Sequence, residues 1–247
     1  MYTDFASVYD RLMADVPYAE WAAFYAGLMK AHGVTDGPVA ECACGTGNLT
    51  IPLSRFYERI TGIDLSGPML EKAMEKARLQ GRLIPFVRQD MRKLALPKKA
   101  ACVLSTCDGV NYLTRADDVL SFFHSAFASL RPGGALIFDV STPYKLKTEL
   151  GTCLRALTDP DICYIWQSSF DDGSALFDLR MDIFVSEKTG LYRRLEEEQT
   201  QRAHTREELT AWLSSTGFAD IAFYGDRTMD PPDERELRWH VAAHKPD

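Results

Sequence analysis

The stretch PVAECACGTGNLT, residues 38–50, places an apolar pair, a carboxylate, two cysteines and a loop of small residues next to one another. Three kinds of site fit such a stretch: a metal or redox site on Cys42 and Cys44, a dinucleotide loop on Gly45 and Gly47, or a site for another ligand. No Cys-x-x-Cys occurs in the chain, and no histidine lies near the two cysteines. Zinc sites need such ligands at wider spacing. We therefore predict no metal and expect Cys42 and Cys44 to pack as small apolar side chains.

The chain around this loop alternates short apolar strands with helices, which indicates a mostly parallel sheet with helices on both faces. A capping box at Thr205 and Glu208 begins a last helix that ends at Gly217, and two final strands follow it. The predicted strands are 39–42, 59–63, 84–88, 101–106, 135–140, 218–225 and 236–244, and the predicted helices are 18–32, 48–55, 66–80, 117–130 and 205–217. The expected fold class is therefore α/β, a doubly wound, mostly parallel seven-stranded sheet.

The pattern changes after residue 140. Three consecutive strands are predicted at 163–169, 175–185 and 191–202, with a hairpin turn over 186–190. The middle strand alternates an apolar face with a polar one, as a half-buried antiparallel strand does. Its apolar face holds Phe177, Leu179, Met181, Ile183 and Val185, and its polar face holds Asp178, Arg180 and Asp182. We predict an antiparallel β insertion over 145–202 that covers the substrate side, with 1–144 and 203–247 as the core.

Composition limits the classes of partner. The 247 residues carry a formal net charge of −7 and are 46% hydrophobic. A nucleic-acid partner is unlikely for such a chain, because nucleic-acid binders usually show a basic face. The N-terminus lacks the basic and apolar regions of a signal peptide, and no apolar run reaches the roughly 20 residues that span a bilayer. We expect a cytoplasmic protein without a membrane partner, with its six cysteines as thiols.

The loop departs from the dinucleotide pattern G-x-G-x-x-G. Counted from Gly45, the third glycine position holds Thr50, and counted from Ala43 it holds Asn48. The pattern fails in both registers. A ligand is still expected at this loop, because in open α/β sheets ligands bind beyond the carboxyl ends of the strands, where the strand order reverses.

The loop does fit acidic-x-[Gly/Ala]-x-Gly-x-Gly, which Glu41 opens, and here the chain resembles the class I S-adenosylmethionine-dependent methyltransferases. Asp64 ends the second strand, 19 residues after Gly45. VRQDM, residues 87–91, ends the third strand, and LRPGGALIFDV, residues 130–140, resembles the family's approach to its fifth strand. Four motifs in the right order are more specific than any one of them. The resemblance covers most of 35–142 and the final helix and strands.

The resemblance implies a Rossmann-like methyltransferase fold and S-adenosyl-L-methionine as cofactor. It also implies that Asp64 accepts both ribose hydroxyls and that Asp90 accepts the adenine amino group. The methionine end of this cofactor and its sulfonium cation favour an acidic residue and a loop whose backbone the ligand can approach closely. Glu41, at the start of the glycine loop, suits this end of the cofactor. The full cofactor-binding set is expected to be Tyr9, Glu41, Ala43, Gly45, Gly47, Asn48, Asp64, Leu65, Met69, Asp90, Met91 and Thr106.

Acceptor-side residues are expected at the ends of strands four and five, in the N-terminal segment and in the insertion. FASVYDRLM, residues 5–13, resembles a segment that folds over the cofactor in small-molecule methyltransferases such as sugar N,N-dimethyltransferases, which makes Tyr9 the leading lid residue. The nominated catalytic residues are Asp108, Tyr112 and Tyr9, with Asn111 and Tyr144 as further candidates. For each aromatic residue, packing in the core stays an open alternative. We expect His124 to be an ordinary helix residue. We expect Arg180 to pair with an acid on a neighbouring strand.

The function that follows is methyl transfer from S-adenosyl-L-methionine to nitrogen or oxygen of a small-molecule acceptor, by in-line displacement. Enzymes that methylate base amino groups carry [Asp/Asn/Ser]-Pro-Pro-aromatic after strand four. Residues 106–111 of this chain, TCDGVN, do not have this motif. An Asp-Pro-Pro does occur at 230–232, but Asp233 follows it and we expect it in a turn. RNA or protein stays an alternative acceptor. An NAD-dependent oxidoreductase and a non-catalytic cofactor-binding protein are the other two hypotheses, and a homodimer is left open.

Overall fold

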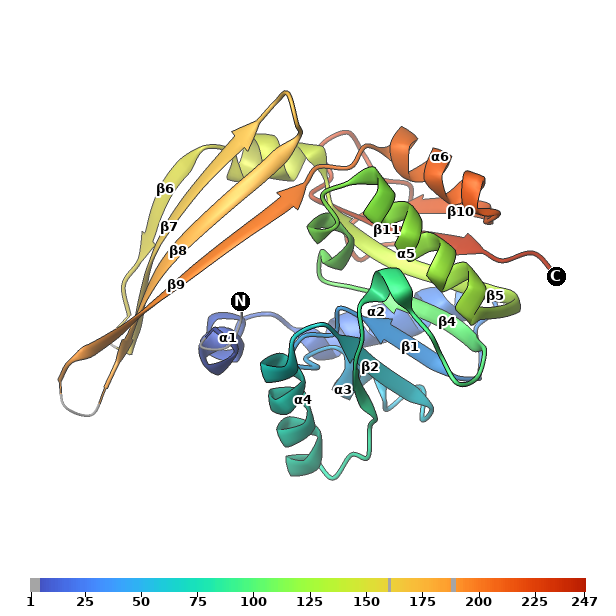
Figure 1. The fold of residues 1–247 in the computed structure, drawn as a ribbon, viewed down its shortest axis with the longest axis horizontal. Coiled ribbons are helices and arrows are strands. Elements are labelled where there is room, and N and C mark those ends of the chain that lie inside the picture. Colours follow the sequence, from blue (N-terminus) through green and yellow to red (C-terminus); the bar gives the residue numbers. More distant parts are fainter. Residues whose placement is uncertain (1–4, 160, 188–189) are drawn as a thin grey trace.

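The computed structural model describes residues 5–159, 161–187 and 190–247 (Figure 1). Its core is a seven-stranded sheet in the order β10-β11-β5-β4-β1-β2-β3. The strands are β1 (Val39–Cys42), β2 (Ile60–Asp64), β3 (Phe86–Arg88), β4 (Ala100–Ser105), β5 (Leu130–Ser141), β10 (Ala219–Tyr224) and β11 (Arg238–His244). Neighbours from β3 to β5 pair in parallel, whereas β11 is antiparallel to both β5 and β10. The predicted doubly wound fold is confirmed, and its strand order reverses between β1 and β4.

Helices cover both faces of this sheet. One apolar layer joins the sheet to α5 (Ala116–Ser129) and α6 (Arg206–Thr216), and another joins it to α2 (Tyr18–Ala31) and α3 (Thr50–Leu53). Successive residues of β4 serve opposite layers, since Val103 belongs to the first and Cys102 and Leu104 to the second. The central strands are therefore buried on both sides, as parallel strands usually are.

The helix ends follow the predicted chemistry. The Ser66 hydroxyl accepts a hydrogen bond from the Met69 amide at the start of α4 (Gly67–Leu79). Thr205 and Glu208 form both bonds of a capping box at α6, and Gly217 ends it with a left-handed φ of 105°. One helix is shorter than predicted over 48–55, because the chain is still turning through Gly47 (φ 73°) and α3 is a single turn.

The insertion is a four-stranded antiparallel sheet that extends from the core as an arm (Figure 1). Three strands were predicted, and β7 (Ile162–Asp171), β8 (Leu176–Ser186) and β9 (Tyr192–Arg202) confirm them. The edge strand β6 (Cys153–Leu157) was missed, because its side chains are mostly exposed and show no alternation. The predicted hairpin turn over 186–190 includes residues 188 and 189, which lie outside the described residues.

Helix α1 (Ala6–Leu12) lies between this arm and the core (Figure 1). Its apolar residues pack on the buried face of β8, and Met69 of α4 and Leu146 of the π-helix Lys145–Leu150 join the same layer. The members from β8 are Phe177, Leu179, Met181, Ile183 and Val185, the predicted apolar face. The insertion sheet thus holds α1 over the carboxyl ends of the core strands.

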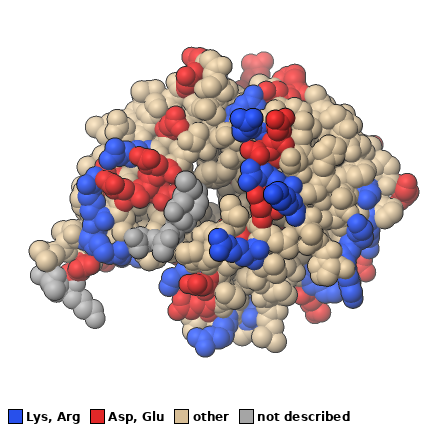
Figure 2. All heavy atoms as spheres, viewed as in Figure 1, with Lys and Arg blue, Asp and Glu red and all other residues tan. Residues whose placement is uncertain are grey.

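The outer face of the insertion carries ion pairs instead. Arg194 contacts Asp182 and Glu196 at 2.5 Å each, and Arg180 contacts Glu196 at 3.5 Å. The predicted cross-strand pairing of Arg180 is confirmed. Figure 2 shows acidic and basic side chains interleaved on the face that it draws.

Two further findings concern the chain as a whole. All six cysteines are free thiols, and Cys42 and Cys44 are buried as predicted. Among residues 5–159, 161–187 and 190–247, no helix has the length and apolarity needed to cross a bilayer.

Candidate functional site

A cavity of about 630 Å³ lies at the carboxyl ends of the central strands, between the loop after β1, helix α1, the 3-10 turn Gly109–Tyr112 and strand β9. Its volume falls in the range of roughly 300–1,000 Å³ that holds small ligands. Nearly all the nominated residues line it: Tyr9, Glu41, Ala43, Gly45, Asn48, Asp64, Leu65, Met69, Asp90, Met91, Thr106 and Tyr112. Gly47 and Asp108 are not among its lining residues.

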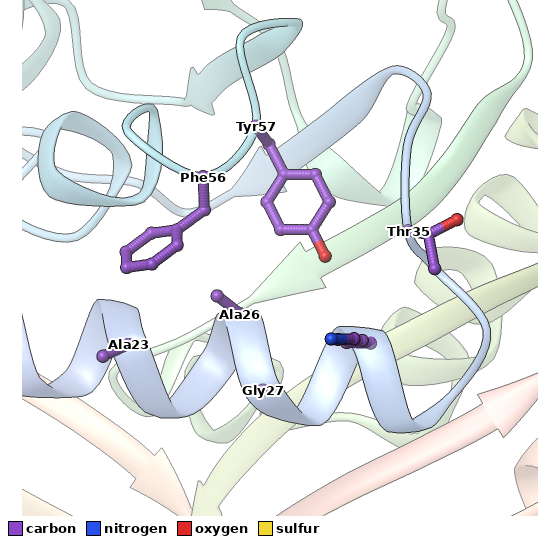
Figure 3. A pocket seen from close by; sticks show the side chains of 7 residues that line it. Ala23, Ala26, Gly27, Thr35, Phe56 and Tyr57 are labelled. Carbon is purple, nitrogen blue, oxygen red and sulfur yellow. The ribbon is translucent and has the colours of Figure 1, made fainter.

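A second hollow, of about 400 Å³, lies between α2 and the segment after α3 (Figure 3). Ala23, Ala26, Gly27 and Lys30 of the helix face Phe56 and Tyr57 across it. None of the nominated residues lines this hollow, so the candidate site is the larger cavity.

Glu41, at the end of β1, is 1% exposed and holds its carboxylate between two hydroxyls. Thr50 donates to Oε2 at 2.5 Å and Thr106 donates to Oε1 at 2.8 Å. Burial raises the pKa of Glu41 to about 7, and the two hydroxyl donors oppose that rise. A cation bound in the cavity would favour the charged form of this side chain.

The glycine loop is tied to the second strand by Asp64. The Gly45 amide donates to Asp64 Oδ2 at 2.8 Å, and the Ser66 amide donates to Oδ1 at 2.8 Å. Burial raises the pKa of Asp64, while these amides oppose the rise. Gly45 and Ala43 both have φ 54°, and a Cβ on Gly45 would meet nothing within 4 Å, so the loop leaves open space at this point.

Gly47 has another purpose. A Cβ there would lie 3.1 Å from the Ala73 side chain and 3.2 Å from the Phe86 ring. Its left-handed backbone and this close approach require glycine. Gly47 therefore lets the loop pack against α4 and β3, and the structure does not place it with the cavity residues.

Asp90, after β3, lines the cavity but is also paired. Arg92 contacts its Oδ2 at 2.6 Å and reaches Asp118 at 2.8 Å with the other nitrogen. Hydrogen bonds from Arg92 hold the pKa of Asp90 below its usual value. Sequence reasoning missed Arg92 and Asp118, although both line the cavity.

Two tyrosines meet at the α1 side of the cavity. The polar ends of Tyr9 and Tyr18 lie near each other, and the Asn48 side chain lies near that of Tyr18. Burial raises the pKa of Tyr18 to about 12 and that of Tyr9 well above its usual value, so both phenols keep their hydrogens at neutral pH. Tyr18 lines the cavity and was not predicted, because nothing in its own helix pattern separates it from core residues.

Polar contacts also hold α1 to the loop. Asp10 of α1 accepts the Thr46 hydroxyl at 2.6 Å and pairs with Lys76 of α4 at 2.8 Å. Lys76 donates in addition to Thr46, at 3.0 Å, and to Asn48 Oδ1. The N-terminal helix is thus fixed over the cavity by charges as well as by its apolar face.

Asp108, nominated as a catalytic residue, is not among the residues that line the cavity. Its carboxylate pairs with Arg238 of β11 at 2.6 Å, accepts the Ser141 hydroxyl at 2.8 Å, and lies 3.9 Å from Lys145. Arg238 holds the pKa of Asp108 at about 2, against the effect of burial. This carboxylate therefore forms an ion pair with strand β11. The sequence does not show the pair, because Arg238 lies 130 residues after Asp108.

Cys107 and Asp108 are both left-handed, with φ 56° and 67°, and their amides donate to Asp139 at 2.9 and 2.7 Å. Asp139 is fully buried and also contacts Arg238 and the Tyr25 hydroxyl. The two bonds hold a strained backbone in place. They shape the cavity wall that Cys107, Gly109 and Tyr112 supply.

The remaining candidates lie elsewhere. Asn111 is buried and bonds Ser141 and the Arg202 carbonyl, which joins the end of β5 to the end of β9. Tyr144 donates to Glu149 at 2.8 Å and is not among the residues that line the cavity, and His124 is exposed on α5.

The insertion contributes the wall opposite the loop. Glu198, Gln199 and Thr200 of β9 line the cavity, and Tyr112 donates to Gln199 Oε1 at 2.8 Å. The sequence indicated that the insertion would lie over the substrate side, but not which strand or residues would do so.

Known proteins have sequences similar to that of this chain. Residues 39–134 match the family described as methyltransferase domain. Over 248 aligned residues the chain is 34% identical to "Putative methyltransferase YqeM" of Bacillus subtilis (strain 168), which spans 99% of this chain and 97% of that protein. The chain belongs to the class I S-adenosylmethionine-dependent methyltransferases.

Other relatives of this methyltransferase extend the comparison. The crystal structure of an S-adenosylmethionine-dependent methyltransferase from Clostridium acetobutylicum has a TM-score of 0.89 and 29% identity, over 100% of this chain and 99% of that one. The dTDP-3-amino-3,4,6-trideoxy-alpha-D-glucopyranose N,N-dimethyltransferase of Streptomyces venezuelae is 28% identical over 138 residues, 55% of this chain and 56% of that protein.

The cofactor of the methyltransferase is S-adenosyl-L-methionine. The donor set of the cavity fits this molecule, because it offers carboxylates to a ligand that carries a sulfonium and an ammonium group. Among the lining residues of the core are four carboxylates, on Glu41, Asp64, Asp90 and Asp118, and one guanidinium, on Arg92. The open space at Gly45 permits a close approach to the backbone.

Proposed function

We propose that this methyltransferase modifies a nitrogen or oxygen atom of a small-molecule acceptor, bound in the cavity between the glycine loop and strand β9. The observation that carries the proposal is that the cavity has two facing walls: one wall is the loop of residues 43–46 and the other is Glu198, Gln199 and Thr200 of the insertion. A space of about 630 Å³ between these walls suits a small acceptor beside the cofactor better than a folded macromolecule.

The charge of the cavity narrows the acceptor further. Four carboxylates and one guanidinium among the lining residues of the core favour a cationic or neutral acceptor and disfavour an anionic one. The resemblance to an amino-sugar N,N-dimethyltransferase supports the same class of acceptor. The exposed face in Figure 2 interleaves both signs of charge, which gives RNA no extended basic surface on that side.

For the cofactor we propose roles that follow from position. Asp64 accepts the ribose hydroxyls, Asp90 accepts the adenine amino group, and Glu41 faces the cationic methionine end. Asp64 suits its role because its carboxylate is held by two backbone amides and also lines the cavity. When bound, S-adenosyl-L-methionine supplies a methyl group on sulfur and becomes S-adenosylhomocysteine as the acceptor gains the methyl and releases a proton.

The chain's own residues then orient the acceptor and exclude water. Tyr9 and Tyr18 lie beside the loop, and Tyr112 and Gln199 lie at the insertion side. The insertion, residues 145–202, supports α1 through the apolar face of β8, so the lid and the acceptor wall form one packed unit. Holding the reacting groups together in a dry cavity is the main contribution that such an enzyme makes.

The test is methyl transfer from S-adenosyl-L-methionine to a panel of probes, with S-adenosylhomocysteine and methylated product measured by mass spectrometry. The probes are 3-amino-3-deoxy-D-glucose and glycine as amines, D-glucose as an alcohol, benzoate as an acid, and total RNA and casein as macromolecules. We expect a product from a small probe. A product from RNA or casein alone, or from none of the probes, contradicts the proposal.

Two variants make the result specific. Asp64→Ala is expected to lose turnover, whereas Asp117→Ala, at an exposed acid on α5, is expected to keep it. If both variants and the native chain gave equal product, the activity would come from a contaminant and not from this cavity.

A further inference from the structure

Three segments that are far apart in the chain meet at the Lys76 ammonium group. Its Nζ pairs with Asp10 Oδ2 of α1 at 2.8 Å and donates to Thr46 Oγ1 at 3.0 Å. It also donates to Asn48 Oδ1, two residues after Thr46 in the loop that follows β1. A lysine ammonium has three hydrogens and no acceptor. The three partners therefore use all of its hydrogens, which fixes the end of this flexible side chain.

Thr46 closes the ring of contacts. Its hydroxyl donates to Asp10 Oδ1 at 2.6 Å and accepts from Lys76, so both its hydrogen and its oxygen are engaged. Thr46 is 1% exposed and lines the cavity, as does Asn48. We call these four residues, Asp10, Thr46, Asn48 and Lys76, the Lys76 cluster. The cluster attaches α1 to the glycine loop at the cavity itself.

The charge of Lys76 is balanced from the N-terminal helix. Its carboxylate partner, Asp10, belongs to α1, whereas its two partners in the loop are neutral. Burial lowers the pKa of Lys76, and the hydrogen bond to Asp10 and the charge of that residue oppose this effect. If α1 moves away from the loop, a partly buried cation beside the glycine loop loses its counter-charge.

The two forms of the cofactor differ in their response to that cation. S-adenosyl-L-methionine carries a sulfonium and an ammonium group against one carboxylate, so one positive charge is in excess. S-adenosylhomocysteine has lost the sulfonium charge and is neutral overall. An uncompensated Lys76 beside the loop therefore disfavours the methyl donor more than the product.

We infer that Lys76 is a positioning residue for the cofactor, and that the Lys76 cluster makes closure of α1 and binding of the sulfonium form favour each other. The inference rests on the proposed position of the methionine end beside the glycine loop, but it needs no particular acceptor. Linkage makes the effect reciprocal: closed α1 tightens binding of the methyl donor, and the methyl donor keeps α1 closed. After transfer the sulfonium charge is gone, so this contribution no longer holds the product.

Hydrogen–deuterium exchange read by mass spectrometry measures the closure of α1. We expect saturating S-adenosyl-L-methionine to slow exchange of the α1 amides about tenfold in the native chain and less than about threefold in Lys76→Met. Helix α6, which does not line the cavity, is the internal reference and should exchange alike in both chains. Equal slowing of α1 in the two chains would overturn the inference.

Asp10→Asn tests the charge separately from the contact. The new amide has nearly the shape of the carboxylate and keeps an oxygen for the Thr46 hydroxyl, but it leaves Lys76 without a counter-charge. Relative to S-adenosylhomocysteine, we expect the dissociation constant of S-adenosyl-L-methionine to rise about fivefold, which corresponds to about 1 kcal/mol. Isothermal titration calorimetry measures both ligands, and equal weakening of the two would contradict the inference.

The double variant assigns the effect to Lys76. Adding Lys76→Met to Asp10→Asn removes the uncompensated cation, so the ratio of the two dissociation constants should return to within about twofold of the native ratio. Exchange of the α1 amides should stay as fast as in Lys76→Met. A ratio that remains shifted about fivefold would assign the effect to Asp10 itself and refute the role of Lys76.

A matched control lies one turn earlier on α4. Lys72 pairs with Glu75 at 3.2 Å on the exposed side of the helix, so Lys72→Met removes the same charge without touching the Lys76 cluster. It should keep the native exchange and the native ratio, and effects as large as those of Lys76→Met would overturn the inference. If Lys76→Met unfolds the chain, the ratio in Asp10→Asn still decides. A failed search for small acceptors would count against the proposed function alone, whereas an unshifted ratio would count against the Lys76 cluster alone.

Discussion

Two groups of carboxylates lie at the same edge of the core sheet but have opposite surroundings. Glu41 and Asp64, at the ends of β1 and β2, are held by hydroxyls and backbone amides and line the cavity. Asp108 and Asp139, beside β4 and in β5, pair with Arg238. The two groups share this edge of the sheet, but the groups that hold their carboxylates differ.

The difference shows what makes a strand-end acid available to a ligand. A carboxylate whose charge is balanced by a buried guanidinium holds the protein together. A carboxylate that neutral donors hold keeps its charge uncompensated, and a cationic ligand can then compensate it. The first two acids are therefore candidates for the cofactor, and the second two are structural.

The largest expected effect comes from removing the shared counter-ion. Arg238→Met leaves Asp108 and Asp139 buried without their cation, and we expect it to lower the free energy of unfolding by about 3–5 kcal/mol. Urea denaturation monitored by circular dichroism measures this. Arg227→Met, at a half-exposed arginine paired with Asp226, is the control and should cost less than about 1 kcal/mol. Equal effects of the two substitutions would remove the distinction between the groups.

The pH dependence of stability should come from the carboxylates that line the cavity, and from Glu41 in particular. The folded chain keeps the Glu41 proton up to a pKa of about 7, whereas the unfolded chain releases it near the ordinary value of 4.5. The folded state binds more protons in this window, so the contribution of Glu41 to stability falls as the pH rises through it. Between pH 5 and 8 we expect the native chain to lose about 2.5 kcal/mol relative to Glu41→Gln.

The measurement is the free energy of unfolding of both chains across that range, with Glu58→Gln as a control at an exposed acid. Parallel pH profiles for the native chain and Glu41→Gln would show that Glu41 is compensated in the folded state. It would then belong with Asp108 and not with the ligand-facing acids.

Asp64→Ala tests the ligand-facing group directly. Loss of a buried charged hydrogen-bond partner should weaken the binding of S-adenosylhomocysteine by about 1–3 kcal/mol, which is roughly tenfold to a hundredfold. Isothermal titration calorimetry gives the affinity, and Asp117→Ala serves as the exposed control. Unchanged affinity in Asp64→Ala would place the ribose elsewhere and undo the comparison for this residue.

Much of this arrangement could be predicted from local patterns. Alternating apolar strands and helices indicated the doubly wound sheet, and the capping box at Thr205 was confirmed because it depends on residues three apart. That Glu41 and Asp64 line one cavity could be predicted because the glycine loop and the next strand end are close in sequence. These features rest on short-range chemistry.

Most of the features that the sequence did not reveal depend on contacts between residues that are distant in the chain. Asp108 resembled a ligand-facing acid until Arg238, 130 residues later, was placed beside it. Gln199 could not be assigned to the cavity because its contact with Tyr112 spans 87 residues. Thr50 is only nine residues from Glu41, yet a threonine in a predicted helix gives no sign that its hydroxyl meets a buried carboxylate.

The smallest expected effect tests whether hydroxyls alone hold the charge of Glu41. Thr106→Val removes the 2.8 Å bond to Oε1 and leaves the Thr50 bond in place. Because the lost bond favours the ionised form, the pKa of Glu41 should rise further, and the loss of stability should be about 1 kcal/mol at pH 8 and smaller at pH 5. Urea denaturation at the two pH values measures both, with Thr210→Val on the exposed side of α6 as the matched control. A loss of equal size at pH 5 and pH 8 would mean that Thr106 supports packing and not charge, and that another group compensates Glu41.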